Sequence, residues 1–340
     1  MRPKAYIEHE GVSYSQLSKL ATSPKVYKFG EEEGDDSDNK YQLKGSEVDV
    51  LTFEPDTFDS NFIVIDKSTY PVDSIKGVVD ELFKRGLTNL ELRDSVTSVA
   101  TELNYQPNWK WDTKWNRIKE DGKSYMTSLA QSKGRKVIPN TDYFKANEIV
   151  SLIKDNQFTQ KYFRKGMSED GRYEVRFQVP VYWNIPVHLG SGVITAKSLF
   201  DIIFIDHELK TIRGVDLKTT GRSWKMFPYE YVKWKYYLQA AFYTGALLQY
   251  RGAELMGYTI VPFEFIVVES SCANQPVIFP CSQGDLIAGK IGGTLVDSKR
   301  VIKGYEQLIK ELLWHQEHDL WDYPMEVYEN NGRVVLESFN

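Results

Sequence analysis

The chain has 340 residues, with a hydrophobic content of 41% and an aromatic content of 14%, so a substantial core is expected and disorder is not. Its formal net charge of −5 counts mildly against bulk electrostatic binding of nucleic acid, but leaves room for a site of clustered carboxylates with a local basic track. No apolar run of about 18 residues and no secretory signal is visible. The two cysteines, Cys272 and Cys281, predict a reducing, cytoplasmic location and exclude a four-thiolate cluster.

The N-terminal segment 13–29 predicts a short helix that is capped near Ser13 or Ser15 and ends at Pro24. The acidic run 31–40 has no apolar partner and is expected to be a solvated loop. A second helix is expected from Gly45-Ser46 to Pro55, with Asp49 close to its apolar side.

The region 60–165 is mostly helical by composition and is expected to be an elaboration inserted before the strands that follow. It contains the aromatic stretch NWKWDTKWNRIK, in which Trp109, Trp111 and Trp115 could stack on nucleobases. Packing within a core explains the same three tryptophans, and we favour that interpretation.

From residue 172 the hydrophobic period changes from helix to strand. YEVRFQVPVYW alternates apolar and polar residues, which is typical of a half-buried strand, and the strands 199–205 and 210–220 are expected to form a hairpin around His207. A long helix is expected over 229–250, a further strand over 258–269 and an amphipathic helix over 296–318. The order is therefore helix, three strands, helix, strand.

Asp216-Leu217-Lys218 is the first candidate site in this region. Residues two apart on a strand point to the same face, so Asp216 and Lys218 can reach one pocket. Other Asp-x-Lys triplets occur at Asp112, Asp121 and Asp297, but their surroundings are typical of a protein surface.

Asp201 is the one carboxylate in the apolar strand LFDIIFI, and it is costly to bury without a partner. The hairpin places it opposite residues 214–216, where Asp201 and Asp216 could share a cation. A structural ion pair between Asp201 and Lys218 is the alternative. We favour magnesium, because it accepts sparse carboxylate ligation and keeps waters that can bind a phosphate. The Leu217 carbonyl could assist, and Lys218 would stabilise developing charge.

Gln239 and Tyr243 are four residues apart on the expected helix 229–250 and therefore lie on one of its faces. Such a pair also arises by chance in packed helices. Its place directly after the hairpin favours a supporting role at the same site.

The order Asp201, then Asp216-Leu217-Lys218-Thr219-Thr220, then Gln239-x-x-x-Tyr243 resembles the RecB/RecE-like, phage-exonuclease branch of the PD-(D/E)XK nucleases. The segments 13–29 and 45–58 resemble the opening segment and the Gly-x-x-x-His helix of such proteins, whereas 60–165 matches only loosely. The resemblance implies an α/β fold with a restriction-endonuclease-like core, α-β-β-β-α-β, in which helices flank a central mixed sheet.

The resemblance also implies one nuclease domain over 1–340, with a helical elaboration over 60–165, a catalytic core over 166–270 and a C-terminal helix and tail over 284–340. Its expected activity is Mg²⁺-dependent cleavage of DNA, with Mn²⁺ able to substitute, as an exonuclease in phage-type recombination or DNA metabolism in the host cytoplasm. Lys218 is then catalytic, and Gln239 and Tyr243 support the site. A catalytically decayed DNA-binding or assembly module and a structure- or site-specific endonuclease are the alternatives.

Two positions depart from or extend the family pattern. Asp49 stands where many relatives carry a histidine ligand, and Glu174 matches an additional acidic position, although an exposed strand glutamate explains it nearly as well. Arg222, Lys225, Lys233 and Lys235 could bind the DNA backbone or form a solvated face. The expected partner is DNA and not a membrane; a single-strand annealing or recombination protein and a homo-oligomer stay open. An iron–sulfur cluster is not expected.

Overall fold

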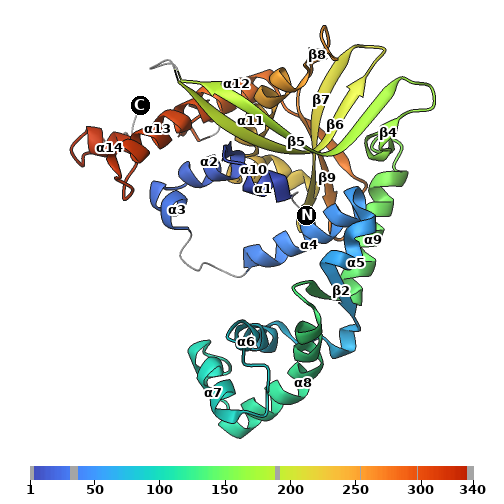
Figure 1. The fold of residues 1–340 in the computed structure, drawn as a ribbon, viewed down its shortest axis with the longest axis vertical. Helices are drawn as coiled ribbons and strands as arrows, with labels where there is room; N and C mark the ends of the chain where they lie inside the picture. The colour runs from blue at the N-terminus through green and yellow to red at the C-terminus, as the bar shows by residue number, and fades with distance from the viewer. Residues whose placement is uncertain (1–3, 31–36, 188–191, 253, 297, 335–340) are drawn as a thin grey trace. The chain divides into compact units, whose positions relative to one another are not determined.

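The computed structural model describes residues 4–334 except 31–36, 188–191, 253 and 297. The chain divides into two compact units, one of Ser46–Val150 and the other of Arg2–Gly45 together with Ser151–Asn340. Figure 1 follows the elements along the chain by colour. Within the described ranges, no helix combines the length and the apolar composition that crossing a membrane requires.

The first unit is mainly helical and overlaps the region that the sequence sets apart over 60–165. Its helices and strands are the C-terminal part of α4 (Ser37–Phe53), α5 (Phe58–Asn61), β2 (Phe62–Ile65), α6 (Asp73–Lys84), α7 (Arg93–Glu102), α8 (Trp111–Gln131), β3 (Lys136–Pro139) and most of α9 (Asn140–Asp155). β2 and β3 pair in parallel. A separate hydrophobic core lies between α6, α7 and α8 and is centred on residues such as Val79, Val96 and Ile118.

Two of the three tryptophans in the first unit pack against a hydrophobic core, as we favoured from the sequence. Trp111 and Trp115 pack against the core of this unit, and the Trp115 indole Nε1 donates to the Leu90 carbonyl at 3.1 Å. Trp109 is 44% exposed.

The second unit contains a mixed sheet whose strands run in the order β10-β9-β7-β6-β5-β4, flanked by helices. Its strands are β4 (Gly166–Met167), β5 (Tyr173–Pro186), β6 (Val193–Asp206), β7 (Thr211–Thr220), β9 (Glu264–Glu269) and β10 (Val277–Pro280), with the short β1 (Val12–Ser13) beside β6 and β8 (Thr259–Ile260) beside β7. β5, β6 and β7 pair antiparallel, which confirms the predicted hairpin, and β7 and β9 pair in parallel. The carboxyl ends of β7 and β9 therefore meet at one edge of the sheet.

α11 packs on one face of this sheet, against β5, β6 and β7, and α12 packs on α11 (Figure 1). The helices of this unit are α1 (Lys4–Glu8), α2 (Tyr14–Leu20), α3 (Pro24–Phe29), α10 (Phe227–Lys233), α11 (Tyr236–Tyr250), α12 (Gln283–Ile291), α13 (Tyr305–His318) and α14 (Met325–Glu329). Leu17 of α2 and Leu238 and Phe242 of α11 are fully buried in the same core as Ile203 and Phe265 of the sheet.

The N-terminal prediction is confirmed in its capping. Ser13 accepts a hydrogen bond from the Gln16 amide and caps the start of α2, and Pro24 begins α3 instead of continuing the first helix. Of the acidic run 31–40, residues 31–36 lie outside the described ranges, and residues 37–40 belong to α4, so the loop prediction is wrong there.

The single helix predicted over 229–250 is wrong at its start. α10 ends at Lys233 and α11 begins at Tyr236, because Lys235 adopts a left-handed backbone with φ of 57°. Tyr236, Gln239 and Tyr243 therefore belong to a helix that is separate from α10.

Two further boundaries differ from prediction. The strand expected over 258–269 is interrupted before Glu264, at Pro262, which has no N–H group for a central ladder. The helix expected over 296–318 begins only at Tyr305, after Gly304, whose N–H donates to the Gln307 side chain at 3.1 Å. The preceding residues form the small ribbon of β11 (Gly293–Thr294) and β12 (Val301–Ile302).

Candidate active site

Asp216 and Lys218 lie near the carboxyl end of β7, on the face covered by α11. Lys218 Nζ lies 2.6 Å from Asp216 Oδ2, as an ion pair. Asp216 is 5% exposed, and the Lys218 side chain is 22% exposed. The alternating pattern of the strand therefore delivers a carboxylate and an ammonium to one partly enclosed spot.

Asp201 of β6 approaches the same segment of β7. Its Oδ2 accepts a hydrogen bond from the Leu217 N–H at 3.1 Å, and continuing the register from the Ile202–Val215 pair places Asp201 opposite Asp216. Residues that lie directly opposite on antiparallel strands are about 4.5–5.5 Å apart at Cβ. The two carboxylates that the sequence singles out are thus neighbours.

Gln178 is a residue at this site that sequence reasoning missed. Its amide Nε2 donates to Asp201 Oδ1 at 3.3 Å. Gln178 has a φ of 50°, and the β5–β6 pairing passes from Phe177 to Val179 without it. A non-glycine residue with positive φ in a strand has no local sequence signal, so the alternating pattern alone described Gln178 as an ordinary polar position.

α11 brings Gln239 onto Asp216. Gln239 Nε2 donates to Asp216 Oδ1 at 2.6 Å, and both side chains are buried. Gln239 Oε1 is also buried and has no hydrogen-bond partner among the described residues. An acceptor in this position suits a ligand or water that donates a hydrogen bond beside the two acids.

Tyr243 lies one turn further along α11, as its spacing from Gln239 predicts. It is 8% exposed, and its ring lies 4.8 Å from that of Phe200. Burial is the main cause that raises the pKa of the Tyr243 phenol, and nearby groups that include Asp216 and Asp201 raise it further. Tyr243 is therefore a neutral hydroxyl close to both acids.

Lys218 is held between a carboxylate and an aromatic ring. Its Nζ lies 4.6 Å from the centroid of the Tyr236 ring, the first residue of α11. Burial by itself would lower the pKa of the Lys218 ammonium, but Asp216 and Tyr236 together raise it above its ordinary value. Lys218 is therefore a cation in this structure, suited to stabilise negative charge.

Tyr14 of α2 is a second missed residue near the lysine. Its hydroxyl donates to the Trp234 carbonyl at 2.8 Å and so joins α2 to the segment between α10 and α11. Burial raises the pKa of the Tyr14 phenol, although Lys218 acts in the opposite direction. Tyr14 and Tyr236 are aromatic positions whose nearness to Lys218 depends on tertiary packing, which a one-dimensional pattern does not reveal.

The donor set of Asp201 and Asp216 is of the kind that magnesium accepts. Magnesium is commonly bound through one or two carboxylates and keeps several waters. The described residues contain no group of three His, Cys, Asp or Glu side chains that could hold a metal ion. Two carboxylates and the orphaned oxygen of Gln239 fit a sparse, water-rich site rather than an all-protein cage.

The structure does not bring Glu174 to these residues. Glu174 lies opposite Ile205, four residues along β6 from Asp201, and its carboxylate contacts Arg176 Nε at 2.6 Å and His207 Nε2 at 3.2 Å. Its pKa is lowered: burial opposes this, but Arg176 and then His207 outweigh it. Glu174 is therefore part of an ion-pair cluster with Arg176 and His207 near the turn of the hairpin.

Asp49 lies in α4 within the unit Ser46–Val150 and is half-buried. Its role as a third ligand stays a prediction of the resemblance.

The four basic residues predicted to bind the DNA backbone follow β7. Arg222 lies 4.0 Å from Glu230, Lys225 and Lys233 lie over the neighbouring rings of Trp224 and Trp234, and Lys235 donates to Thr22 Oγ1 at 2.9 Å. Arg222 and Lys225 are exposed close to the carboxyl end of the strand that carries Lys218. Burial lowers the pKa of Lys235.

Comparisons with known proteins add little to this geometry. No protein-family model matches the chain. No curated protein matches it either. Among solved structures, the chain is similar to one from Eubacterium rectale named a "putative exonuclease", at 12% identity and a TM-score of 0.43, covering 97% of this chain and 91% of that one. It is also similar to a protein named SSO0001, at 10% identity and a TM-score of 0.26, covering 78% of this chain and 94% of that one. At such TM-scores neither likeness carries an argument about function, which depends on the residues of this chain.

Proposed function

We propose that the protein is a metal-dependent deoxyribonuclease that acts as an exonuclease and hydrolyses DNA phosphodiester bonds at a site formed by Asp201, Asp216 and Lys218. The observation that carries this proposal is the meeting of two carboxylates and a half-buried lysine on the adjacent strands β6 and β7, with Gln239 donating to Asp216 at 2.6 Å. The resemblance to the RecB/RecE-like branch of the PD-(D/E)XK nucleases agrees with the same residues.

Asp201 and Asp216 would hold Mg²⁺ or Mn²⁺, with the Leu217 carbonyl as an expected further ligand. A divalent cation at this position would polarise the scissile phosphate and lower the pKa of a bound water. Lys218 would donate to the phosphate or to the attacking water and stabilise the charge that develops. The Gln239 amide fixes the Asp216 carboxylate, and the buried Tyr243 lies one turn further along α11.

The ion pair between Lys218 and Asp216 is the structural alternative. An unpaired carboxylate or lysine would be costly to bury, so the pair could exist for stability alone. That alternative assigns no role to the second carboxylate, Asp201, which lies opposite Asp216 and accepts from the Leu217 N–H and the Gln178 amide. Two neighbouring carboxylates are the ligation that magnesium accepts, which favours a cation at the site.

The proposal is tested with linear and circular DNA of the same sequence, incubated with Mg²⁺ or with excess EDTA. An exonuclease degrades the linear DNA only in Mg²⁺ and releases short products from its ends. Cleavage of the circle would make the enzyme an endonuclease. Cleavage in excess EDTA would contradict the metal requirement, and tight binding of DNA without any cleavage would indicate a decayed binding module.

A further inference from the structure

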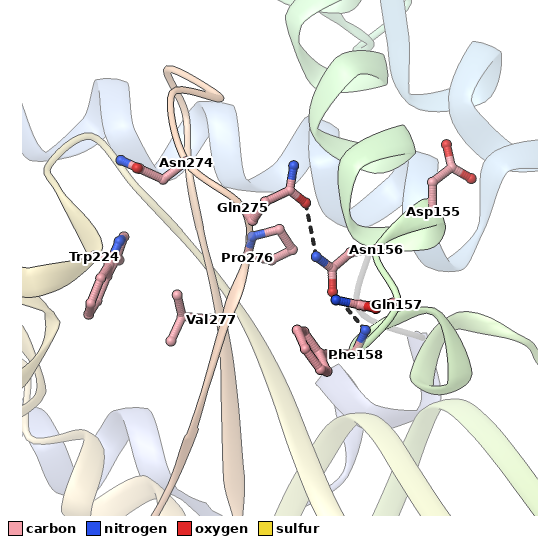
Figure 2. A pocket seen from close by; sticks show the side chains of 9 residues that line it. All are labelled: Asp155, Asn156, Gln157, Phe158, Trp224, Asn274, Gln275, Pro276 and Val277. Carbon is pink, nitrogen blue, oxygen red and sulfur yellow. Dashed lines mark hydrogen bonds between the residues drawn. The ribbon is translucent and has the colours of Figure 1, made fainter.

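A cavity lies at the carboxyl edge of β7 and β9, beyond the residues assigned above. Its volume is about 620 Å³, within the range of roughly 300–1,000 Å³ that is usual for small-ligand sites. It is lined by Asp155, Asn156, Gln157, Phe158, Trp224, Asn274, Gln275, Pro276 and Val277, all of the second unit. Figure 2 shows Trp224 and Phe158 on opposite sides of Val277.

Phe158 is an exposed aromatic ring on a fixed turn. Phe158 is 62% exposed to solvent. Asn156 Oδ1 accepts from the amides of Phe158 at 2.9 Å and Thr159 at 3.2 Å, and the buried Thr159 hydroxyl donates to the Ile153 carbonyl at 2.6 Å. The turn is therefore ordered before any ligand arrives, which lowers the entropic cost of binding to the ring.

Trp224 is held equally firmly on the other side. Its amide donates to Glu269 Oε1 at 2.9 Å, and its ring packs 6.4 Å from that of Phe279. Glu269 also accepts from Asn274 Nδ2, at 3.0 Å to each oxygen, so one carboxylate at the end of β9 anchors two parts of the lining.

The polar groups of the cavity are mostly neutral amides. The Asn274 amide nitrogen donates to Glu269, and its Oδ1 is an acceptor. Gln275 accepts from Asn156 Nδ2 at 2.9 Å through its amide oxygen, and its amide nitrogen is a donor. The lining has one carboxylate, Asp155, and no lysine or arginine. Aromatic rings with neutral donors and acceptors suit a planar heterocyclic base and not a phosphate.

The position of the cavity links it to the candidate active site. β7 ends at Thr220, two residues and roughly 7 Å beyond Lys218, and Trp224 follows four residues later. Thr220 pairs with Glu269, the residue that anchors Trp224 and Asn274. Exposed Arg222 lies between β7 and Trp224 in the sequence, and exposed Lys225 directly follows Trp224, so both are near the path of the intervening phosphates.

We propose that this cavity binds an unpaired nucleobase of the DNA end whose phosphate is cleaved, by stacking against Phe158 and Trp224. The inference rests on the proposed nuclease function and deepens it, because it names single-stranded DNA termini as the preferred substrate. Stacking accepts every base, so the site selects for an unpaired base and not for a sequence.

The test is equilibrium binding, by fluorescence anisotropy in Ca²⁺, of three labelled DNAs: a blunt duplex, the same duplex with a short single-stranded overhang, and the same overhang with abasic nucleotides. The wild-type protein should prefer the overhang that carries bases. Phe158→Ala and Trp224→Ala should each weaken binding to that DNA by roughly 5- to 150-fold, the range for loss of one stacked base. Neither change should weaken binding to the abasic overhang.

Matched variants separate stacking from stability. Trp224→Phe and Phe158→Tyr keep an aromatic face and should keep the preference. Tyr323→Ala removes an aromatic residue that is 56% exposed but does not line the cavity, and should change nothing. If Trp224→Ala fails to fold, the exposed Phe158 decides the question by itself.

A Phe158→Ala protein that keeps the full preference for unpaired bases would overturn this inference. In that case cleavage of linear DNA by the wild-type protein in Mg²⁺ would leave the proposed nuclease function standing. A wild-type protein that neither binds nor cleaves any of the three DNAs would overturn both.

Discussion

Lys218 lies between the carboxylate of Asp216 and the ring of Tyr236, and both contacts keep it charged. A fixed cation beside two acids is useful to phosphate chemistry because it needs no reorganisation when negative charge develops. In the proposed mechanism the two acids would hold the metal ion, and Lys218 would stabilise the negative charge that the metal ion does not neutralise.

Lys218→Ala should therefore reduce the rate of DNA cleavage by on the order of a hundredfold or more, the scale of one lost transition-state contact. Cleavage of end-labelled DNA in Mg²⁺ measures the rate, and circular dichroism checks the fold. Lys123→Ala is the matched control, since Lys123 belongs to another Asp-x-Lys triplet and is exposed on α8. Near wild-type turnover by Lys218→Ala would show that the site is misassigned.

Tyr236 is expected to position Lys218 through the face of its ring. Tyr236→Phe keeps that face and should keep the rate, whereas Tyr236→Leu should lower kcat by about tenfold, the equivalent of ~1.4 kcal/mol for a partly desolvated cation–π contact. KM for DNA should change little, because the ring acts on the lysine and not on the substrate. An equal loss of kcat in Tyr236→Phe and Tyr236→Leu would instead indicate that the Tyr236 hydroxyl group, and not the face of its ring, is what matters.

At the scale of elements, the edge formed by β7 and β9 depends on Glu269. This buried carboxylate accepts from the Trp224 amide and from Asn274, and the Trp224 amide is the largest cause that lowers its pKa. A group whose pKa is lower in the folded protein stabilises it above the unfolded value, near 4.3, and loses that contribution as the pH falls through the folded pKa.

Glu269→Gln should accordingly lower the free energy of unfolding by about 1–2 kcal/mol at pH 7, the scale of a charge-assisted hydrogen bond. The difference from the wild-type protein should shrink as the pH falls below 4. Urea unfolding at several pH values measures it. A difference that is independent of pH would mean that the amide hydrogen bonds do not depend on the charge of Glu269.

The elements that set up the site were largely predictable from the sequence, because hydrophobic period identifies strands. The alternation of β5, the apolar run of β6 and the turn at His207 fixed the hairpin, and with it the nearness of Asp201 and Asp216. Gln239 followed from helical spacing and its contact with Asp216 is observed.

The parts that sequence reasoning missed depend on backbone geometry or distant packing. Nothing local distinguishes Lys235, which breaks the helix at a φ of 57°, or Gln178, with a φ of 50°, from ordinary polar residues. Tyr14 reaches the site only because α2 packs against α11. The predicted ligand Glu174 failed to join the acids because it pairs with Arg176 and His207 at the other end of the hairpin.

At the scale of the whole molecule, each of the two compact units contains a hydrophobic core of its own. Ile118 is fully buried in the core of the unit Ser46–Val150. Ile118→Ala should lower the free energy of unfolding of that unit by about 2–5 kcal/mol, the usual cost of an isoleucine cavity. Hydrogen exchange should show lost protection in α6 and α8, with β6 and β7 unchanged. Equal loss in both units would show that they unfold together.

The central claim is that Asp216 and its neighbours cleave DNA with the help of a divalent cation. It is tested most directly by following end-labelled linear DNA with the wild-type protein and with Asp216→Asn, side by side in Mg²⁺. Asp216→Asn keeps the size of the side chain but removes the charge that would hold the cation. The wild-type protein should degrade the DNA and the folded variant should leave it intact. Equal degradation by the two proteins would contradict the account.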